Sequence, residues 1–352
     1  MLSKSSFRIF AFLSPFFFWG CSSDYLLDLG AESLPSGGTW LIDESFILQA
    51  CPGQDCIPNL TNPEMVQSGS PQLSYLDDND LVVGIKRGEN TYAFPHPILD
   101  WHEIVNMGDY TISYCPLTGS ALHVMDDRGF GVSGLLYNSN LIMYDKESNS
   151  FWPQMFLKSA AGRNRGEELV IDRMIETTWG TWKKLFPETY VVSSRTGHSR
   201  NYNAYPYGTF KSDNNINFPI ENSDSRLHPK RRVMGILSGS EAKAYQIADF
   251  GTASIVHDVV GGENFVIFGS AKHNFIVTFR TNRHFSVKSY DLDNGGLWFT
   301  DSETGSVWNI FGEAVSGPLE GEVLAYGKSF ISYWFAWAAF YPQTNIWKGA
   351  GK

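Results

Sequence analysis

The chain has 352 residues, of which 43% are hydrophobic, 15% aromatic and 18% charged. This composition excludes an intrinsically disordered chain, which combines few aromatic residues with a high density of charge. The formal net charge of −10 and the lack of a long basic run exclude a general nucleic-acid binder. We therefore expect no nucleic-acid partner, and the length allows one large domain or two ordinary ones.

Residues 1–20 have the layout of a secretory signal peptide. Lys4 and Arg8 precede an apolar stretch, at 9–19, that is too short to span a bilayer. A glycine comes directly before Cys21 and a serine follows it, an arrangement that resembles a bacterial lipoprotein cleavage site. We therefore predict that Cys21 is lipidated and anchors the protein in the cell envelope, to a bacterial membrane, facing the periplasm or the exterior. Ordinary cleavage and an uncleaved anchor are the alternatives.

Residues 21–79 are interpreted as the lipid-attachment cysteine and a leader, which contains Cys51 and Cys56. A Pro-Gly turn signal between these two cysteines would bring their sulfur atoms together. In an oxidising envelope we expect a local disulfide, and a two-cysteine metal clip is the alternative. Cys115 is then left as an unpaired thiol in an exported protein.

The chain resembles itself at an offset of about 155 residues. The clearest matching segments are 145–152 with 301–308 and 179–189 with 334–344. We predict two related units, the first repeat at 80–195 and the second repeat at 232–348. A polar connector, rich in Asn, Ser, Tyr and Arg, joins them at 196–231.

Each repeat is predicted to consist mostly of strands. In the first repeat, the β-rich segments 81–85 and 91–94 flank a short charged loop with a glycine, which indicates a hairpin. One segment in each repeat has a helical pattern, 177–186 in the first and 332–340 in the second, and a proline ends each. We therefore expect a mainly β (α+β) protein of two tandem lobes, barrel- or sandwich-like, each with one short amphipathic helix.

Several motifs, taken together, resemble a known family. They are Asp55-Cys-Ile-Pro58, Trp101-His-Glu-Ile-Val-Asn106, Tyr114-Cys-Pro-Leu-Thr-Gly-Ser120, Gly131-Val-Ser-Gly-Leu-Leu-Tyr-Asn138 and Thr177-Thr-Trp-Gly-Thr-Trp182. In this order they are similar to the domain-of-unknown-function family numbered 3179, over roughly residues 38–348. The resemblance implies an exported bacterial or archaeal protein, often a lipoprotein, with no established activity. Some members carry a second cysteine where this chain has Thr118, so a Cys-x-x-Cys pair is not implied here.

The repeat provides an internal control for function. Residues present in both repeats, such as the tryptophan pairs at 179/182 and 334/337, are expected to be scaffold. Residues found in only one repeat are candidates for a functional site. Cys115 belongs to this second class, because the matching position in the second repeat is Ser270.

The candidate residues in the first repeat are His96, His102, Glu103 and Cys115, with Thr118 and Ser120 close by. One interpretation is a copper or zinc site, in which His102 and Cys115 are ligands and His96 or Glu103 completes the set. A second is a catalytic thiol, in which His102 activates Cys115 and Glu103 or an asparagine orients the imidazole. The third is a buried, inert cysteine beside a core histidine.

The connector supplies a second candidate site. Arg200, Tyr202, Tyr205 and Tyr207 could bind an anionic or sugar ligand between the lobes, and an ordered surface loop is the alternative. We favour a binding or accessory module of the cell envelope, rather than an enzyme, with a metal or small-ligand site near His102 and Cys115. The competing hypotheses are a thiol-dependent enzyme that uses the same two residues and a purely structural envelope protein. The partner, a small molecule or a protein, has no signature in the sequence.

Overall fold

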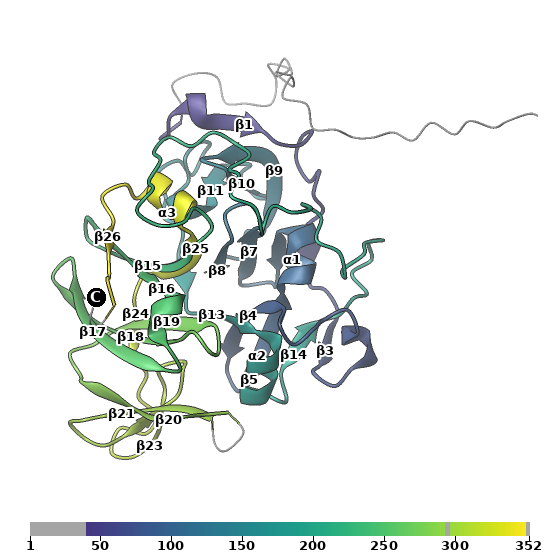
Figure 1. Ribbon diagram of the computed structural model, residues 1–352. Helices are drawn as coiled ribbons and strands as arrows, with labels where there is room; N and C mark the ends of the chain where they lie inside the picture. The colour runs from purple at the N-terminus through teal and green to yellow at the C-terminus, as the bar shows by residue number, and fades with distance from the viewer. Residues whose placement is uncertain (1–39, 293–295, 350–352) are drawn as a thin grey trace, which may run out of the picture. The chain divides into compact units, whose positions relative to one another are not determined.

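The computed structural model describes residues 40–292 and 296–349 of the chain. Strands account for 41% of the residues and helices for 11%, which confirms the prediction of a mainly β protein. The described strands form six separate sheets, and none of these is closed into a barrel (Figure 1). The predicted signal peptide and the predicted lipidation at Cys21 lie outside the described residues. Within the described ranges, no helix is long and apolar enough to cross a membrane.

Three sheets contain the strands of the first repeat, together with short strands from the leader. The first sheet consists, in spatial order, of β13 (Ile175–Thr178), β4 (Leu81–Arg87), β5 (Asn90–Pro95), β14 (Tyr190–Val192) and β3 (Met65–Gln67). The second consists of β12 (Ile171–Asp172), β8 (Ser120–Val124), β7 (Thr111–Cys115), β6 (Ile104–Asn106) and β2 (Leu60–Thr61). The third consists of β1 (Ile47–Gln49), β9 (Phe130–Tyr137), β10 (Asn140–Asp145) and β11 (Phe151–Pro153).

The second repeat forms three sheets that repeat the central strand order of the first, without counterparts of the leader strands β1, β2 and β3. The first consists of β25 (Ser329–Tyr333), β15 (Arg232–Ser238), β16 (Glu241–Gln246) and β26 (Asn345–Ile346). The second consists of β24 (Ala325–Tyr326), β19 (Phe275–Arg280), β18 (Glu263–Ser270) and β17 (Ser254–Val260). The third consists of β20 (Phe285–Asp291), β21 (Gly296–Asp301), β22 (Val307–Trp308) and β23 (Ala314–Ser316). In both repeats the hairpin of the first sheet gains a parallel strand, as β14 pairs with β5 and β26 with β16.

Two helices occupy equivalent places in the repeats. They are α2 (Trp179–Leu185), which follows β13, and α3 (Trp334–Phe340), which follows β25. Both lie inside the predicted helical segments, and the Thr178 hydroxyl caps α2 by accepting a hydrogen bond from the Thr181 amide. Four short 3-10 helices, at Glu44–Phe46, Pro71–Leu73, Gln154–Phe156 and Ile247–Phe250, complete the helical elements of the described residues.

Each of these helices buries a tryptophan against a glycine of the neighbouring sheet. A Cβ atom at Gly84 would lie 2.1 Å from the Trp182 ring, and one at Gly235 would lie 2.0 Å from the Trp337 ring. The indole N–H of Trp182 donates to a threonine hydroxyl at 3.0 Å, and that of Trp337 does so at 2.8 Å. The same packing in both repeats supports the interpretation of the tryptophan pairs as scaffold.

The first repeat contains one helix that we did not expect, α1 (His96–His102). Its proline, Pro97, falls in the first turn, where its missing N–H is not needed for an intrahelical bond. The helix ends at Glu103, which has a φ of 56°. Because positions four apart share a helix face, His96 and Asp100 lie one above the other. The Pro97 segment is therefore the start of a helix, in addition to the one helical segment that we predicted for this repeat.

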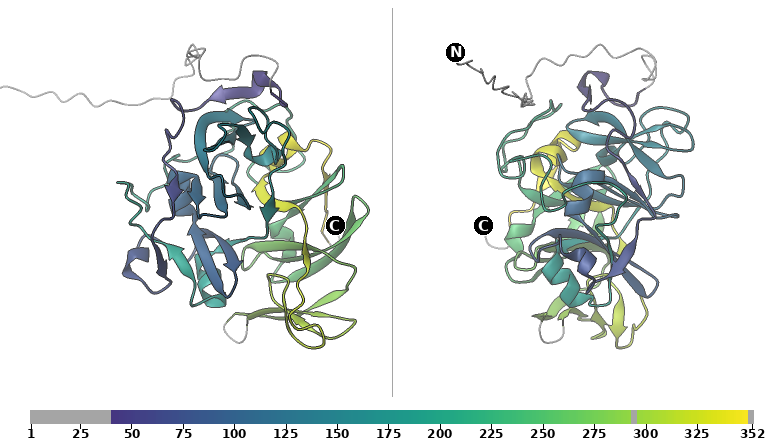
Figure 2. Two further views of the ribbon diagram at one scale, coloured as in Figure 1. Left: turned by 180° about the vertical axis from the view of Figure 1, so that it is seen from behind. Right: turned by 90° about the vertical axis from the view of Figure 1, so that its right-hand side faces the viewer.

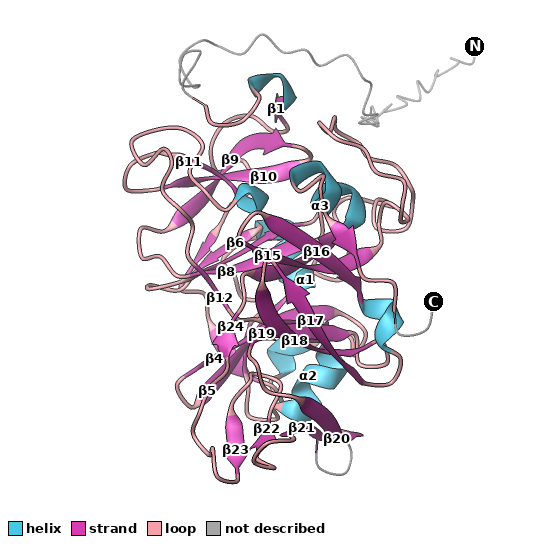
Figure 3. Cartoon of the chain, turned by 90° about the vertical axis from the view of Figure 1, so that its left-hand side faces the viewer, coloured by secondary structure: helices cyan, strands magenta, loops and turns pink. Residues whose placement is uncertain are grey.

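The two repeats share their hydrophobic cores. β13 of the first repeat packs beside β19 of the second, and β25 packs beside β8 in the reciprocal contact. One core combines residues of 82–192 with residues of 266–324, and another combines residues of 104–169 with residues of 233–338. In Figure 2, the yellow segment around α3 lies against the teal strands of the first repeat, and Figure 3 shows α2 near β21. Each repeat therefore completes the core of the other.

Candidate ligand-binding site

His102 is fully buried, and both of its ring nitrogens have partners. Nδ1 lies 2.7 Å from the carbonyl oxygen of Pro58, and Nε2 lies 2.8 Å from the Tyr202 hydroxyl. Burial lowers the pKa of His102 to about 4, so the ring is neutral at pH 7. Because a carbonyl oxygen can only accept, Nδ1 carries the proton and Nε2 accepts from Tyr202. Neither nitrogen has a free lone pair for a metal ion.

Cys115 is a buried free thiol, and its sulfur lies 3.9 Å from the carbonyl oxygen of Ser139. Burial and the nearby charge of Glu103 raise the pKa of Cys115 to about 11, so the thiol is protonated at neutral pH. No hydrogen bond joins Cys115 to His102 in the described part of the chain. The arrangement therefore does not support activation of Cys115 by His102.

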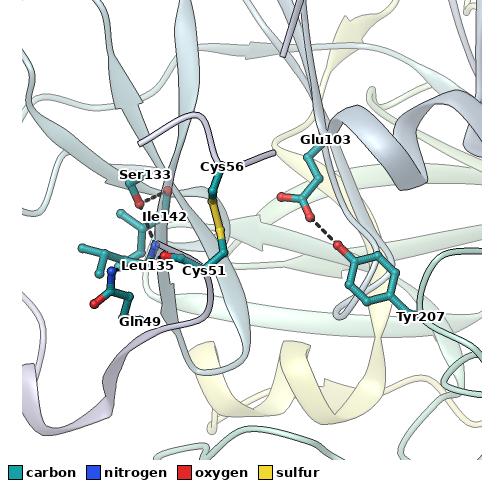
Figure 4. Close-up of a disulfide and its surroundings, with 8 residues drawn as sticks. All are labelled: Gln49, Cys51, Cys56, Glu103, Ser133, Leu135, Ile142 and Tyr207. Atoms are coloured by element: carbon teal, nitrogen blue, oxygen red, sulfur yellow. Dashed lines mark hydrogen bonds between the residues drawn. A yellow bond between two sulfur atoms is a disulfide. The ribbon is translucent and has the colours of Figure 1, made fainter. Parts of the chain in front are cut away.

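Glu103 is a buried carboxyl group with one side-chain hydrogen bond, which it accepts from the Tyr207 hydroxyl at 2.9 Å (Figure 4). Burial raises the pKa of Glu103 to about 7. Figure 4 also shows the disulfide between Cys51 and Cys56, which closes the local loop in the leader. The described residues contain no group of three or more His, Cys, Asp or Glu side chains that could hold a metal ion. The suggested copper or zinc site at His96, His102 and Cys115 thus has no cluster of ligands in this region.

Thr118 and Ser120, the other polar residues near Cys115, belong to a buried hydrogen-bond network. The Thr118 hydroxyl lies 2.8 Å from that of Ser120, which donates to Gln154 Oε1 at 2.6 Å. The Asn140 amide donates to Thr118 at 2.9 Å and to Gln154 at 2.9 Å. These groups satisfy one another, so the network stabilises the first repeat without offering an open site.

A polar cavity of about 380 Å³ lies where the two repeats, the leader and the connector meet. Its wall contains five tyrosine side chains, Tyr75, Tyr114, Tyr202, Tyr205 and Tyr333. Its charged and titratable lining residues are Asp77, Asp80, Asp100, His96, Lys211 and Arg232. Two of the four connector residues that we singled out, Tyr202 and Tyr205, line the cavity. Of the other two, Tyr207 holds Glu103, and the Arg200 guanidinium lies 5.6 Å from the centre of the Trp101 ring.

The fold positions the lining residues from both repeats. His96 and Asp100 project from the same face of α1, whereas Arg232 and Tyr333 are paired residues at the ends of β15 and β25. Gly119, in the turn after β7, makes room for the Tyr333 ring. A Cβ atom at Gly119 would lie 2.9 Å from that ring, and its φ of 56° also favours glycine.

One lining residue, Arg232, belongs to a buried ion pair with Glu176, which does not itself line the cavity. The Glu176 side chain is fully buried and accepts a hydrogen bond at Oε1 from the guanidinium of Arg232, which also donates to Asn274 at 2.9 Å. His96 Nε2 lies 3.5 Å from the second carboxylate oxygen of Glu176. Burial lowers the pKa of His96 well below its usual value, so its ring is neutral. The charge of Arg232 is therefore compensated within the protein.

A second ion pair lies at the wall of the cavity. Lys211 Nζ lies 2.8 Å from Asp100 Oδ2, and burial raises the pKa of Asp100 to about 6 although Lys211 opposes the shift. Three residues of the lining each have a buried atom without a hydrogen-bond partner, namely His96 Nε2, Asp100 Oδ1 and the Tyr205 hydroxyl. Since buried polar groups are costly unless they are paired, unpaired atoms at a cavity indicate where a ligand would bind.

A larger groove, of about 750 Å³, does not have this character. Its charged residues pair with one another, as Lys328 does with Glu168 at 3.3 Å and Arg280 with Glu263 at 2.8 Å. None of the unpartnered buried atoms among the described residues lines it. The smaller polar cavity is therefore the better candidate site.

Some cavity residues occur in only one of the two repeats, as we expect for residues of a functional site. By strand register, His96 directly follows β5 as Ile247 follows β16, and Arg232 starts β15 as Leu81 starts β4. At each of these two matched positions, one repeat has a charged or titratable side chain and the other has an apolar one. The same comparison could have identified Arg232 from the sequence. Asp100, Glu176 and Lys211 have no such signal, because their contacts depend on how the repeats and the connector pack.

The geometry defines a mainly β protein with an internal repeat and a polar cavity that residues of both copies line. Residues 54–344 match the family described as "Protein of unknown function (DUF3179)", which covers most of the chain. The chain belongs to this family, which confirms the resemblance found in its motifs. No curated protein and no solved structure was found to match it.

Proposed function

We propose that the protein is a binding module for a small polar molecule, and that the cavity between the repeats is its binding site. The observation that carries this proposal is that three residues lining one cavity, His96, Asp100 and Tyr205, each have a buried polar atom without a hydrogen-bond partner. Ligand sites combine apolar or aromatic walls with a few convergent polar groups, and the tyrosine-rich lining matches this pattern. The proposal also places the module at a bacterial membrane through lipid on Cys21, on the strength of the signal sequence alone.

The alternative of a thiol-dependent enzyme has less support. Cys115 is buried, its pKa is raised to about 11, and His102 is held by Pro58 and Tyr202. A thiolate nucleophile needs the opposite environment, with partial exposure and a depressed pKa. The cavity therefore remains the site that the arrangement of side chains favours.

The test is a thermal-shift screen of the purified full chain, in detergent, against sugars, amines, carboxylates and nucleosides. A ligand at 100 times its Kd stabilises the folded state by about 2.7 kcal/mol, which raises Tm by roughly 4 °C in a protein of this size. Asn79→Trp fills the mouth of the cavity from an exposed lining position, whereas Asn90→Trp adds the same ring to a distant hairpin. We expect at least one compound to raise Tm in the wild type and in Asn90→Trp, but not in Asn79→Trp. A screen without such a compound would refute the proposed site.

A further inference from the structure

We propose that the cavity takes a ligand with a positively charged amino group, and that the Lys211 ammonium occupies the position of that group in the ligand-free protein. This inference rests on the proposed binding function and assigns the chemical class of its ligand. In this proposal, Lys211, a residue of the connector that lines the cavity, takes the place of the ligand when no ligand is bound.

The contacts of Lys211 are those by which proteins recognise an ammonium group. Its Nζ lies 2.8 Å from Asp100 Oδ2 and 4.1 Å from the centre of the Tyr205 ring. A carboxylate together with the face of an aromatic ring attracts a cation through its full charge and through the ring quadrupole. The two partners belong to the wall of the cavity, so they are in place whether or not Lys211 is bound.

Lys211 itself is held less firmly than its partners. Its side chain is 37% exposed, whereas that of Asp100 is 5% exposed. A ligand ammonium in the same place keeps the buried Asp100 carboxylate paired, while the partly exposed Lys211 side chain regains rotamer freedom in solvent. A ligand ammonium can therefore replace the Lys211 ammonium at a small cost.

The ligand has one more acceptor available than Lys211 uses. Asp100 lines the cavity, and its Oδ1 is buried and has no hydrogen-bond partner, whereas Lys211 bonds only to Oδ2. An ammonium group has three donors, so one that enters through the cavity can bond both oxygens. The Tyr205 hydroxyl, also unpartnered, is a further group for the rest of the ligand.

The balance of charge in the lining favours a cation over an anion. Three aspartates, Asp77, Asp80 and Asp100, line the cavity together with two cationic residues, Lys211 and Arg232. Arg232 is already paired with Glu176, a residue outside this set of three. When Lys211 leaves, the carboxylates are therefore in excess, and an anionic ligand would meet repulsion.

The experiment compares three probes with the same five-carbon chain, namely cadaverine, 1,5-pentanediol and glutarate. Their binding to the full chain is measured by calorimetry in the wild type and in Lys211→Met, which keeps the stem of the side chain but removes the charge. We expect Lys211→Met to bind cadaverine roughly tenfold more tightly than the wild type, because the competing ammonium is gone. Asp100→Asn should weaken cadaverine binding in both backgrounds.

Lys183→Met is the matched control. Lys183 is also a half-exposed lysine that pairs with an aspartate, Asp78, and lies over an aromatic ring, that of Trp179 at 5.9 Å. It does not line the cavity. We expect its substitution to leave cadaverine binding unchanged, and thermal unfolding of each variant checks that it is folded.

The outcomes separate this inference from the function on which it rests. If Lys211→Met fails to increase cadaverine affinity, or if glutarate or pentanediol binds better than cadaverine, the ammonium assignment is overturned. Binding of either uncharged or anionic probe that is lost in Asn79→Trp would keep the cavity as a binding site while rejecting the amino ligand. A failure of the whole screen described above would reject both.

Discussion

Glu103→Gln tests whether this carboxyl group is as deeply buried as its surroundings indicate. Glu103 is 5% exposed and accepts a single side-chain hydrogen bond, from Tyr207. Glutamine has nearly the same shape and keeps an oxygen that can accept the same bond, but it cannot ionise. The substitution therefore removes the proton equilibrium of Glu103 and little else.

The magnitude follows from the raised pKa. Burial brings the pKa of Glu103 to about 7, from its usual 4.5. At 1.36 kcal/mol for each pH unit, the ionised group costs the folded state about 3 kcal/mol relative to the unfolded state. Because the folded protein binds this proton more tightly, the stabilising contribution is complete below about pH 4.5. It is lost as the pH rises from there through 7.

The assay is urea denaturation of the wild type and of Glu103→Gln at several pH values between 4.5 and 8.5. We expect the free energy of unfolding of the variant, relative to that of the wild type, to rise by about 3 kcal/mol across this range. The buried histidines titrate in both proteins, so their effect cancels in the comparison. Tyr207→Phe is the control, because it retains the carboxyl group and with it the pH dependence. Parallel pH profiles for the wild type and Glu103→Gln would show that the carboxyl is not buried as described.

Two further predictions concern the scaffold and the free thiol. Gly84→Ala and Gly235→Ala should each lower the free energy of unfolding by about 3 kcal/mol, since the new methyl group overlaps a buried tryptophan ring. Gly69→Ala, where a Cβ atom meets nothing within 4 Å, should change it by less than about 0.5 kcal/mol in the same urea titration. Cys115 should react with Ellman's reagent only after denaturation, because the thiol is buried and protonated. Rapid reaction of the native protein would contradict the described environment.

The sequence predicted those parts of the fold that local pattern and repetition encode. The strands, the two equivalent helices and the tryptophan scaffold follow from alternation, capping signals and the match between 179–189 and 334–344. Helix α1 was missed because Pro97, which breaks most helices, falls in the one turn that tolerates it. Local pattern therefore misleads where a residue's effect depends on its position within an element.

The candidate site was harder to predict, because its contacts join distant parts of the chain. Lys211 and Asp100 are separated by 111 residues, and Arg232 and Glu176 by 56 residues. We selected His102 and Cys115 for their chemistry, but each has its own buried partners and the two do not contact each other through a hydrogen bond in the described residues. The connector was a better guide, since Tyr202 and Tyr205 do line the cavity. The packing of the two repeats against each other could not be predicted from the sequence, and the cavity forms only through that packing.

The reciprocal contacts of β13 with β19 and of β25 with β8 make this single chain behave like a covalent dimer. The connector then acts as a tether that keeps two complementary halves at a high effective concentration. A half taken alone would expose the apolar surface that its counterpart covers. The free energy of unfolding is therefore a property of the two halves together. Because the tether also carries Tyr202, Tyr205 and Lys211, the segment that holds the halves together contributes directly to the cavity between them.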